Sequence, residues 1–302
     1  MTPREIIAEA WAITTRTPSL RRWAFTSSLL ETLLSIKLIG YQVYFTYEFF
    51  LRGGEPGFFD IEIMLFNTLP FWAFATIVGS FLFLVLIEFF LPHVCLGAII
   101  GLGAKAYRKE TVKGGLVLGL YNFGAVFAIH EFLTLSGIST IVTVSSLTLR
   151  YIKGPIQTWI LFMIAGLFLF SMVLKFFFSF AEEGVVTQKL GILEAIGKSF
   201  KMIVSHLGHV VFLLILLFVI SLRILINAVM IVLLPAVIIG LGLLLTLFLS
   251  DLISYAIAGI VGLALIIAVS YMFGYILAFK QTVWTITYLE LIRQKDLDVI
   301  VD

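Results

Sequence analysis

Apolar residues in this chain are gathered into long runs, separated by short segments that hold most of the charges. A run of about 20 residues at 1.5 Å per residue crosses the ~30 Å hydrocarbon core of a bilayer as a helix. The runs do not alternate with polar residues, as barrel strands would. They predict an all-α polytopic bundle of six transmembrane helices, forming a single transmembrane domain over residues 1–302. The predicted spans are Trp23–Phe50, Pro70–Ile100, Leu116–Gly137, Pro155–Phe180, His209–Leu234 and Leu252–Phe279.

The apolar stretch from His209 to Ser250 is long enough for one span or for two short ones. Arg223 is its only charge before Ser250, and Pro235 and Gly240 would allow a turn. No polar loop separates the two halves, however. One long helix with an extended exit is therefore expected, and two spans remain the alternative.

Three shorter segments place apolar residues on one helical face and charges on the others, a pattern typical of helices that lie in the headgroup plane. The first opens with Thr2-Pro3-Arg4-Glu5, a capping-box pattern with proline at the first helical position. The others are Tyr107–Tyr121, which is weaker, and Thr187–His206. Each precedes a pair of predicted spans.

This order divides the chain into units of interfacial helix plus hairpin over residues 3–104, 105–182 and 183–295, and internal repeats are common in membrane folds. The alternative is that basic amphipathic helices occur in cytoplasmic loops without any repeat.

Lysine and arginine positions between the spans indicate the orientation in the membrane. Only Arg52, Arg150 and Lys153 lie in the connections on one side, whereas the other side holds most of the remaining basic residues and both termini. We therefore expect a multi-pass protein of the cytoplasmic (inner) membrane with both termini in the cytoplasm. The residues expected to bind anionic headgroups are Arg16, Arg21, Arg22, Lys109, Lys198 and Lys201.

Composition agrees with this picture and limits the classes of function. The chain is 61% hydrophobic and 13% charged, with a net charge of +2, whereas soluble domains are about 45–50% apolar and about 25% charged. A soluble enzyme is excluded, and the small net charge argues against a nucleic-acid partner. The expected partners are membrane lipids and another membrane or cytoplasmic protein.

Ionisable residues inside the predicted spans are costly in hydrocarbon and are the candidates for ligand binding or ion pairing. They are Glu31, Lys37, Glu88, His130, Glu131, Lys175 and Arg223. Counting the helical rise from the cytoplasmic end places Arg223 level with Glu131, or with its neighbour His130, and Lys175 level with Glu88. Each pair could be structural or could line a polar pathway, and Lys175 could instead snorkel to the interface.

Residue patterns for metal binding and catalysis are incomplete. His93 and Cys95 project about 200° apart on a helix, and the pair His206 and His209 has no third ligand nearby. No metal site and no cofactor are expected. The chain also has no serine-nucleophile, zinc-protease or phosphate-loop motif, so an enzyme is not expected.

Small residues recur at the spacing that lets helices pack closely. Gly97-x-x-x-Gly101 and Gly115-x-x-x-Gly119 allow two backbones to approach each other. Packing within the chain is the expected use, and a seam between two copies is the alternative.

The carboxy-terminal third carries short motifs. Ala181-Glu182-Glu183-Gly184-Val185-Val186 and Glu194-Ala195-Ile196-Gly197-Lys198-Ser199-Phe200-Lys201 precede a long apolar run, and Thr285-Ile286-Thr287-Tyr288-Leu289-Glu290-Leu291-Ile292-Arg293 follows the last span. Over residues 180–295 the chain resembles a diffuse group of bacterial polytopic proteins. This group includes the membrane domain of glycerophosphodiester phosphodiesterases and several uncharacterised inner-membrane families. The last motif has one extra residue before Arg293 compared with that group.

The resemblance implies a membrane domain. It implies no activity, because the group has none in common and this sequence shows no phosphodiesterase catalytic domain. The sequence therefore favours a non-enzymatic membrane scaffold or accessory protein that acts through lipid or partner contacts. The alternative is a small transporter or channel with a polar pathway near Arg223 and Glu131.

Overall fold

The computed structural model describes residues 1–54, 57, 59–134 and 138–298, and it is all-α over these ranges. Within them, side chains are not described at 46, 50, 132–134, 138–140, 142, 219–236, 239, 251–252, 255 and 295–298. The helices are α1 (Pro3–Arg16), α2 (Pro18–Thr46), the π-helical turn η1 (Tyr47–Leu51), α3 (Asp60–Thr68), α4 (Phe71–Tyr107), α5 (Gly115–Thr134), α6 (Ile138–Tyr151), α7 (Pro155–Phe177), α8 (Ala181–Gln188), α9 (Ile192–Ser205), α10 (Leu207–Leu245) and α11 (Asp251–Asp298).

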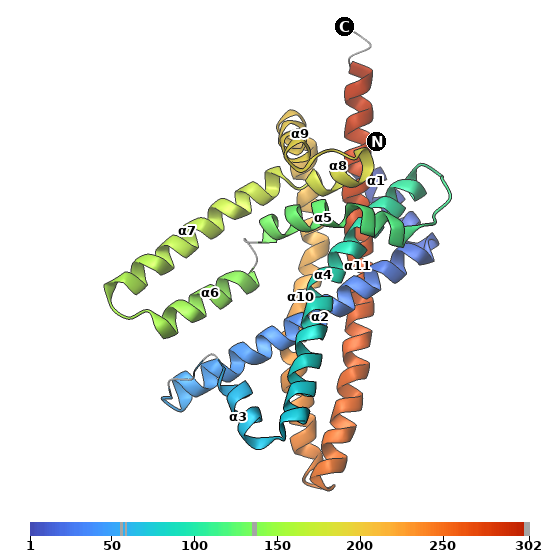
Figure 1. Cartoon of the computed structure of the whole chain (residues 1–302). Helices are drawn as coiled ribbons and strands as arrows, with labels where there is room; N and C mark the ends of the chain where they lie inside the picture. The colour runs from blue at the N-terminus through green and yellow to red at the C-terminus, as the bar shows by residue number, and fades with distance from the viewer. Residues whose placement is uncertain (55–56, 58, 135–137, 299–302) are drawn as a thin grey trace.

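The longest helix, α11, forms the axis of the molecule (Figure 1). Helix α10 runs beside it in the opposite direction, α1, α2 and α4 pack against it, and α5 packs on α4. The short helix α8 contacts both α5 and α9. Helices α6 and α7 pair with each other as a hairpin that projects from this body (Figure 1).

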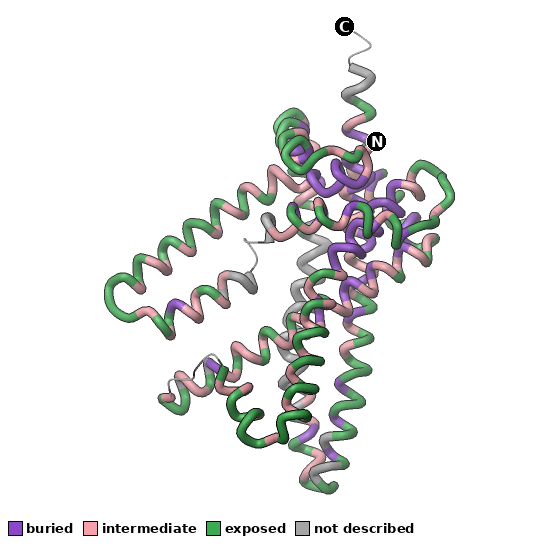
Figure 2. The backbone as a smooth tube through the Cα atoms, in the orientation of Figure 1, coloured by how far each residue is buried: buried purple, intermediate pink, exposed green. Residues whose placement is uncertain are grey.

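Buried residues are concentrated at one end of the molecule, which we call the head (Figure 2). There α1, α5 and α8 meet the carboxy-terminal halves of α4 and α11. The long helices leave the head with their apolar side chains uncovered: Phe83 is 63% exposed, Phe162 is 71% exposed and Ile260 is 70% exposed. Exposed apolar surface on this scale marks contact with a partner or a membrane rather than water.

Three helical segments of the described chain are long and apolar enough to cross a membrane: Phe71–Tyr107, Pro155–Gln188 and Ala256–Gln294. A fourth candidate is α9 together with Leu207–Phe218 at the start of α10, although these two segments meet at a bend of 95°. The structure therefore supports a membrane protein with three or four candidate spans, fewer than the six predicted.

The lower number of candidate spans arises mainly at two of the six predicted spans. Trp23–Phe50 lies largely within α2, where Glu31, Lys37 and several hydroxyl residues lower the mean hydropathy. Leu116–Gly137 lies in α5, which counts only as a shorter apolar helix over Gly115–Glu131, and residues 135–137 lie outside the described residues. For the stretch after His209, the preferred single helix is confirmed, because α10 is continuous from Leu207 to Leu245.

Two of the three predicted amphipathic helices are confirmed as helices. The capping box of α1 is formed: Glu5 N donates to Thr2 Oγ1 and Thr2 N donates to the Glu5 carboxylate at 2.8 Å. These bonds hold the pKa of the Glu5 carboxyl below its usual range. Their contribution is present above the unfolded-state pKa and is lost as the pH falls through the lowered folded-state pKa. The segment Thr187–His206 contains α9.

The third predicted amphipathic helix, Tyr107–Tyr121, is wrong. Helix α4 ends at Tyr107, and a turn reverses the chain before α5 begins at Gly115. Lys109 and Gly114 have φ of +59° and +81° in this turn, in the left-handed region that interrupts a right-handed helix. The second of the three predicted units therefore begins with a turn instead of an interfacial helix.

Helices α4 and α5 approach closely at the predicted glycines. A Cβ added at Gly97 would lie 3.4 Å from Gly119 Cα, and one added at Gly119 would meet the carbonyl oxygen of Val94. Gly101 lies against the side chain of Leu118. The expectation that these glycines serve packing within the chain is confirmed.

Candidate functional site

Glu88 on α4 forms a buried ion pair with Lys37 on α2. The Lys37 ammonium lies 2.7 Å from Oε1 and 2.8 Å from Oε2 of Glu88. Glu88 is 2% exposed and Lys37 is 23% exposed, and the ammonium lies 5.2 Å from the centre of the Phe81 ring. The predicted pairing of Glu88 with Lys175 is therefore wrong. Lys175 is exposed in the last turn of α7, at the end of that helix that joins the head.

Two histidine–carboxylate pairs lie side by side where α4, α5 and α8 meet. His93 Nε2 is 3.1 Å from Oε1 of Glu131, and His130 Nδ1 is 2.9 Å from Oε1 of Glu182. The two imidazole rings meet edge to face with centroids 5.0 Å apart. We call these four residues the His–Glu cluster. His130 and Glu131 are neighbours in the chain but contact different helices, because adjacent residues point about 100° apart on a helix.

The predicted pair of Arg223 with Glu131 is not decided by these contacts, because the Arg223 side chain lies outside the described residues. The contact described for Glu131 is with His93. The Arg223–Glu131 pair stays a prediction.

Polar contacts continue from the His–Glu cluster to α2 and α11. Glu183, beside Glu182 in α8, is 1% exposed and accepts a hydrogen bond from Gln281 Nε2 at 2.7 Å. Its other oxygen, Oε2, is buried with no hydrogen-bond partner among the described residues. On α2, Glu31 accepts a bond from Ser27 Oγ at 2.8 Å and lies within electrostatic reach of His130. The sequence-predicted residues Glu31, His130 and Glu131 are thus brought together in one region of the head.

Glu182, Glu183 and Gln281 also belong to this region, although they are not among the residues predicted from the sequence. The two glutamates lie between the predicted spans Pro155–Phe180 and His209–Leu234, in a connection where charged residues are ordinary. A signal was present, however: a Glu-Glu pair flanked by Ala181 and by Val185 and Val186, with no basic residue nearby, is unusual for a solvated loop. All of residues 181–186 are buried.

Replacing Gln281 with leucine is expected to destabilise the protein by about 1–3 kcal/mol, because the buried Glu183 carboxyl would lose the hydrogen bond that it accepts. The matched control is Gln157→Leu, since the contact described for the Gln157 side chain is a hydrogen bond to the exposed Leu149 carbonyl oxygen on the projecting hairpin. Unfolding of both variants in mild detergent measures the effect. Equal midpoints for the two variants would contradict the assigned role of Gln281.

Within the described ranges, no group of three or more histidine, cysteine, aspartate or glutamate residues is arranged to hold a metal ion. His206 Nδ1 is 3.2 Å from the Met202 carbonyl oxygen, and Cys95 is fully buried in α4. The polar groups of the head therefore form paired contacts between helices, and the geometry offers no metal centre in this part of the chain.

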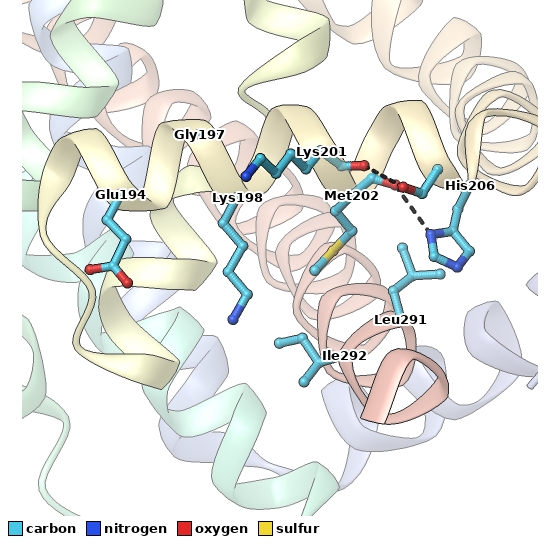
Figure 3. A pocket seen from close by; sticks show the side chains of 9 residues that line it. Glu194, Gly197, Lys198, Lys201, Met202, His206, Leu291 and Ile292 are labelled. Atoms are coloured by element: carbon cyan, nitrogen blue, oxygen red, sulfur yellow. Dashed lines mark hydrogen bonds between the residues drawn. The ribbon is translucent and has the colours of Figure 1, made fainter. Parts of the chain in front are cut away.

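A cavity of about 430 Å³ lies between α9 and the end of α11 (Figure 3). Lys198 and Lys201, both predicted headgroup-binding residues, line it together with Glu194 and His206 on the α9 side. Leu291 and Ile292 of α11 form the opposite wall. Lys198 Nζ also donates to Gln188 Oε1 at 2.6 Å, and Tyr288 donates to the same oxygen at 2.8 Å.

The other predicted headgroup-binding residues lie on the first two helices and on the turn after α4. Arg16, Arg22 and Lys109 are exposed. Arg21 is half-buried, and its Nε is enclosed without a hydrogen-bond partner among the described residues. None of these four lines the cavity beside α9.

Comparison with known proteins found no family model, no curated protein and no solved structure that matches this chain. The resemblance to the bacterial membrane-domain group stays a prediction.

Proposed function

We propose that this protein is a non-enzymatic integral membrane protein, a scaffold or accessory protein that acts through lipid and partner contacts. The surface of α9 carries the proposal. Leu193, Phe200 and Val204 share one face of this helix and are 84%, 45% and 54% exposed. The opposite face holds the buried Ala195 and Met202. Helix α9 therefore presents an apolar stripe away from the protein, and the stripe needs a covering that is not water.

Helix α9 is held in place by specific contacts with the head. Ser199 Oγ donates to the Phe177 carbonyl oxygen at 2.9 Å and accepts from Phe180 N at 3.1 Å. The axis of α9 meets the start of α10 at 95°. If α10 spans the bilayer, this angle lays α9 along the membrane surface, with its apolar stripe against the acyl chains and its lysines among the headgroups.

The proposed topology has six crossings in the inner membrane, with both termini in the cytoplasm. Helices α4, α7 and α11 supply three crossings, and α2, α5 and α10 supply the others. The distribution of basic residues between these helices supports the orientation. The proposed partners are membrane lipids and a second membrane or cytoplasmic protein.

Fluorescence quenching tests the membrane contact of α9. A fluorophore on Leu193→Cys in phospholipid vesicles is expected to be quenched severalfold more strongly by lipids spin-labelled on the acyl chain than one on Glu194→Cys. Both positions are exposed, but they point about 100° apart on the helix. The single native cysteine, Cys95, is fully buried, so background labelling is small. Equal quenching at the two positions would overturn the proposal.

The His–Glu cluster favours a second candidate function, a small transporter or channel. Intramembrane ionisable residues commonly mark proton or substrate pathways, and here Glu31, Glu183 and the two histidine–glutamate pairs lie in one region of the head. Proteoliposomes loaded with a pH-sensitive dye separate the two candidates. Proton flux that is lost in His130→Gln would favour the transporter and contradict the scaffold.

A further inference from the structure

The cationic wall of the cavity beside α9 is formed by two lysines. Lys198 and Lys201 are three residues apart, a spacing that places both on one face of a helix. Neither takes part in an ion pair that the structure describes. Figure 3 shows Lys198 reaching from α9 toward α11. Its bond to Gln188 fixes one of its three N–H donors and leaves the other two for a ligand. The wall is complementary to an anion such as a phosphate.

The other walls of the cavity are partly apolar, so a ligand that is only an ion would leave them without a matching contact. Leu291, Ile292 and Met202 give the cavity an apolar side, which suits the glycerol backbone and first methylenes of a lipid. Gly197 also lines the cavity, and a Cβ added there would meet nothing within 4 Å. On the helix surface Gly197 lies between Lys201 and Val204, so no side chain separates the lysines from the exposed apolar stripe. A ligand can therefore extend from the cationic wall to that stripe.

Glu194 limits the kind of headgroup. It lines the end of the cavity away from His206, where a second negative charge would be repelled and a hydroxyl or ammonium would be accepted. The volume of about 430 Å³ lies within the range of small-molecule sites.

We infer that this cavity binds the phosphodiester headgroup of one membrane glycerophospholipid, with the phosphate on Lys198 and Lys201, a hydroxyl or amine of the headgroup at Glu194, and the acyl chains along Leu193 and Val204. The inference rests on the proposed membrane location of α9. The proposed contact of α9 with the membrane surface would then include one lipid molecule bound at a defined site.

Titration of the full chain with a lipid tests the inference. The protein is held in an uncharged, phosphate-free detergent with an environment-sensitive fluorophore on Ser205→Cys, a position that lines the cavity. Short-chain phosphatidylglycerol is expected to give a saturable signal. Gly197→Leu, which fills the cavity, is expected to weaken binding more than tenfold, and Lys201→Gln about fivefold.

Gly208→Leu is the matched control, because its Cβ also meets nothing within 4 Å and it does not line the cavity. It is expected to bind as the parent does. Circular dichroism confirms that each variant keeps its helices. Undiminished binding by Gly197→Leu would overturn the inference.

A titration with inorganic phosphate shows whether the cavity binds a lipid headgroup or any free anion. Phosphate is expected to give no signal at concentrations that saturate with phosphatidylglycerol, and an equal signal would overturn the lipid assignment. The quenching at Leu193 described above reports on the proposed function independently. If that quenching persists while the titration fails, only the headgroup site is wrong. If the quenching is absent as well, the membrane role of α9 is wrong.

Discussion

The Lys37→Met variant is expected to lose about 3–5 kcal/mol of stability, the range for a buried ion pair that loses one partner. The reason lies with Glu88, which is 2% exposed and receives both of its close contacts from the Lys37 ammonium at 2.7 and 2.8 Å. Removing the lysine leaves this carboxylate desolvated with no counter-charge from the side chains that the structure describes. Unfolding of the purified protein by denaturing detergent measures the loss.

Two further variants distinguish the stability lost with the Lys37–Glu88 ion pair from the effect of removing any lysine. Lys113→Met removes an exposed lysine from the turn after α4 and is expected to change stability by less than about 0.5 kcal/mol. The double variant Lys37→Met with Glu88→Met is expected to recover most of the loss, because two apolar side chains can replace a buried pair with little net cost. A double variant as unstable as Lys37→Met would contradict this account.

Substituting Gly119 with alanine is expected to destabilise the protein by about 3 kcal/mol, at the upper end of the usual cost of overpacking. The added Cβ would overlap the Val94 carbonyl oxygen and lie 2.8 Å from Val94 Cγ1. The carbonyl belongs to the backbone of α4, so relief requires the two helices to separate. Because α5 carries His130 and Glu131, their contacts with α8 and α4 would lengthen too.

Gly124→Ala provides a control on the same helix. A Cβ at Gly124 meets nothing within 4 Å, so the variant gains only the helix propensity of alanine and is expected to be about 0.5–1 kcal/mol more stable. The two substitutions are chemically identical and are expected to shift the thermal unfolding midpoint in opposite directions. Shifts of the same sign would show that α4 and α5 do not meet at Gly119.

Features that depend on neighbours along the chain were predictable. The capping box of α1 involves residues three apart, and the amphipathic pattern of α9 is a property of its own turns. The single helix after His209 follows from the absence of a polar break. The predicted helix Tyr107–Tyr121 was wrong, because the turn at Lys113-Gly114-Gly115 interrupts its pattern of apolar residues. The spacing of apolar residues does not show where the backbone adopts left-handed φ values.

The sequence by itself determined that this chain is all-helical, that long stretches of it need an apolar environment and that intramembrane charges require partners. Which partners they have was decided by the tertiary structure. Counting residues along a helix gives the depth of Glu88 in the membrane, but it does not show which helix lies beside it. The structure places Lys37 of α2 there, and the depth argument had pointed to Lys175. The paired histidines and the cavity beside α9 likewise arise where separate helices cross, because contacts between distant segments depend on which faces meet.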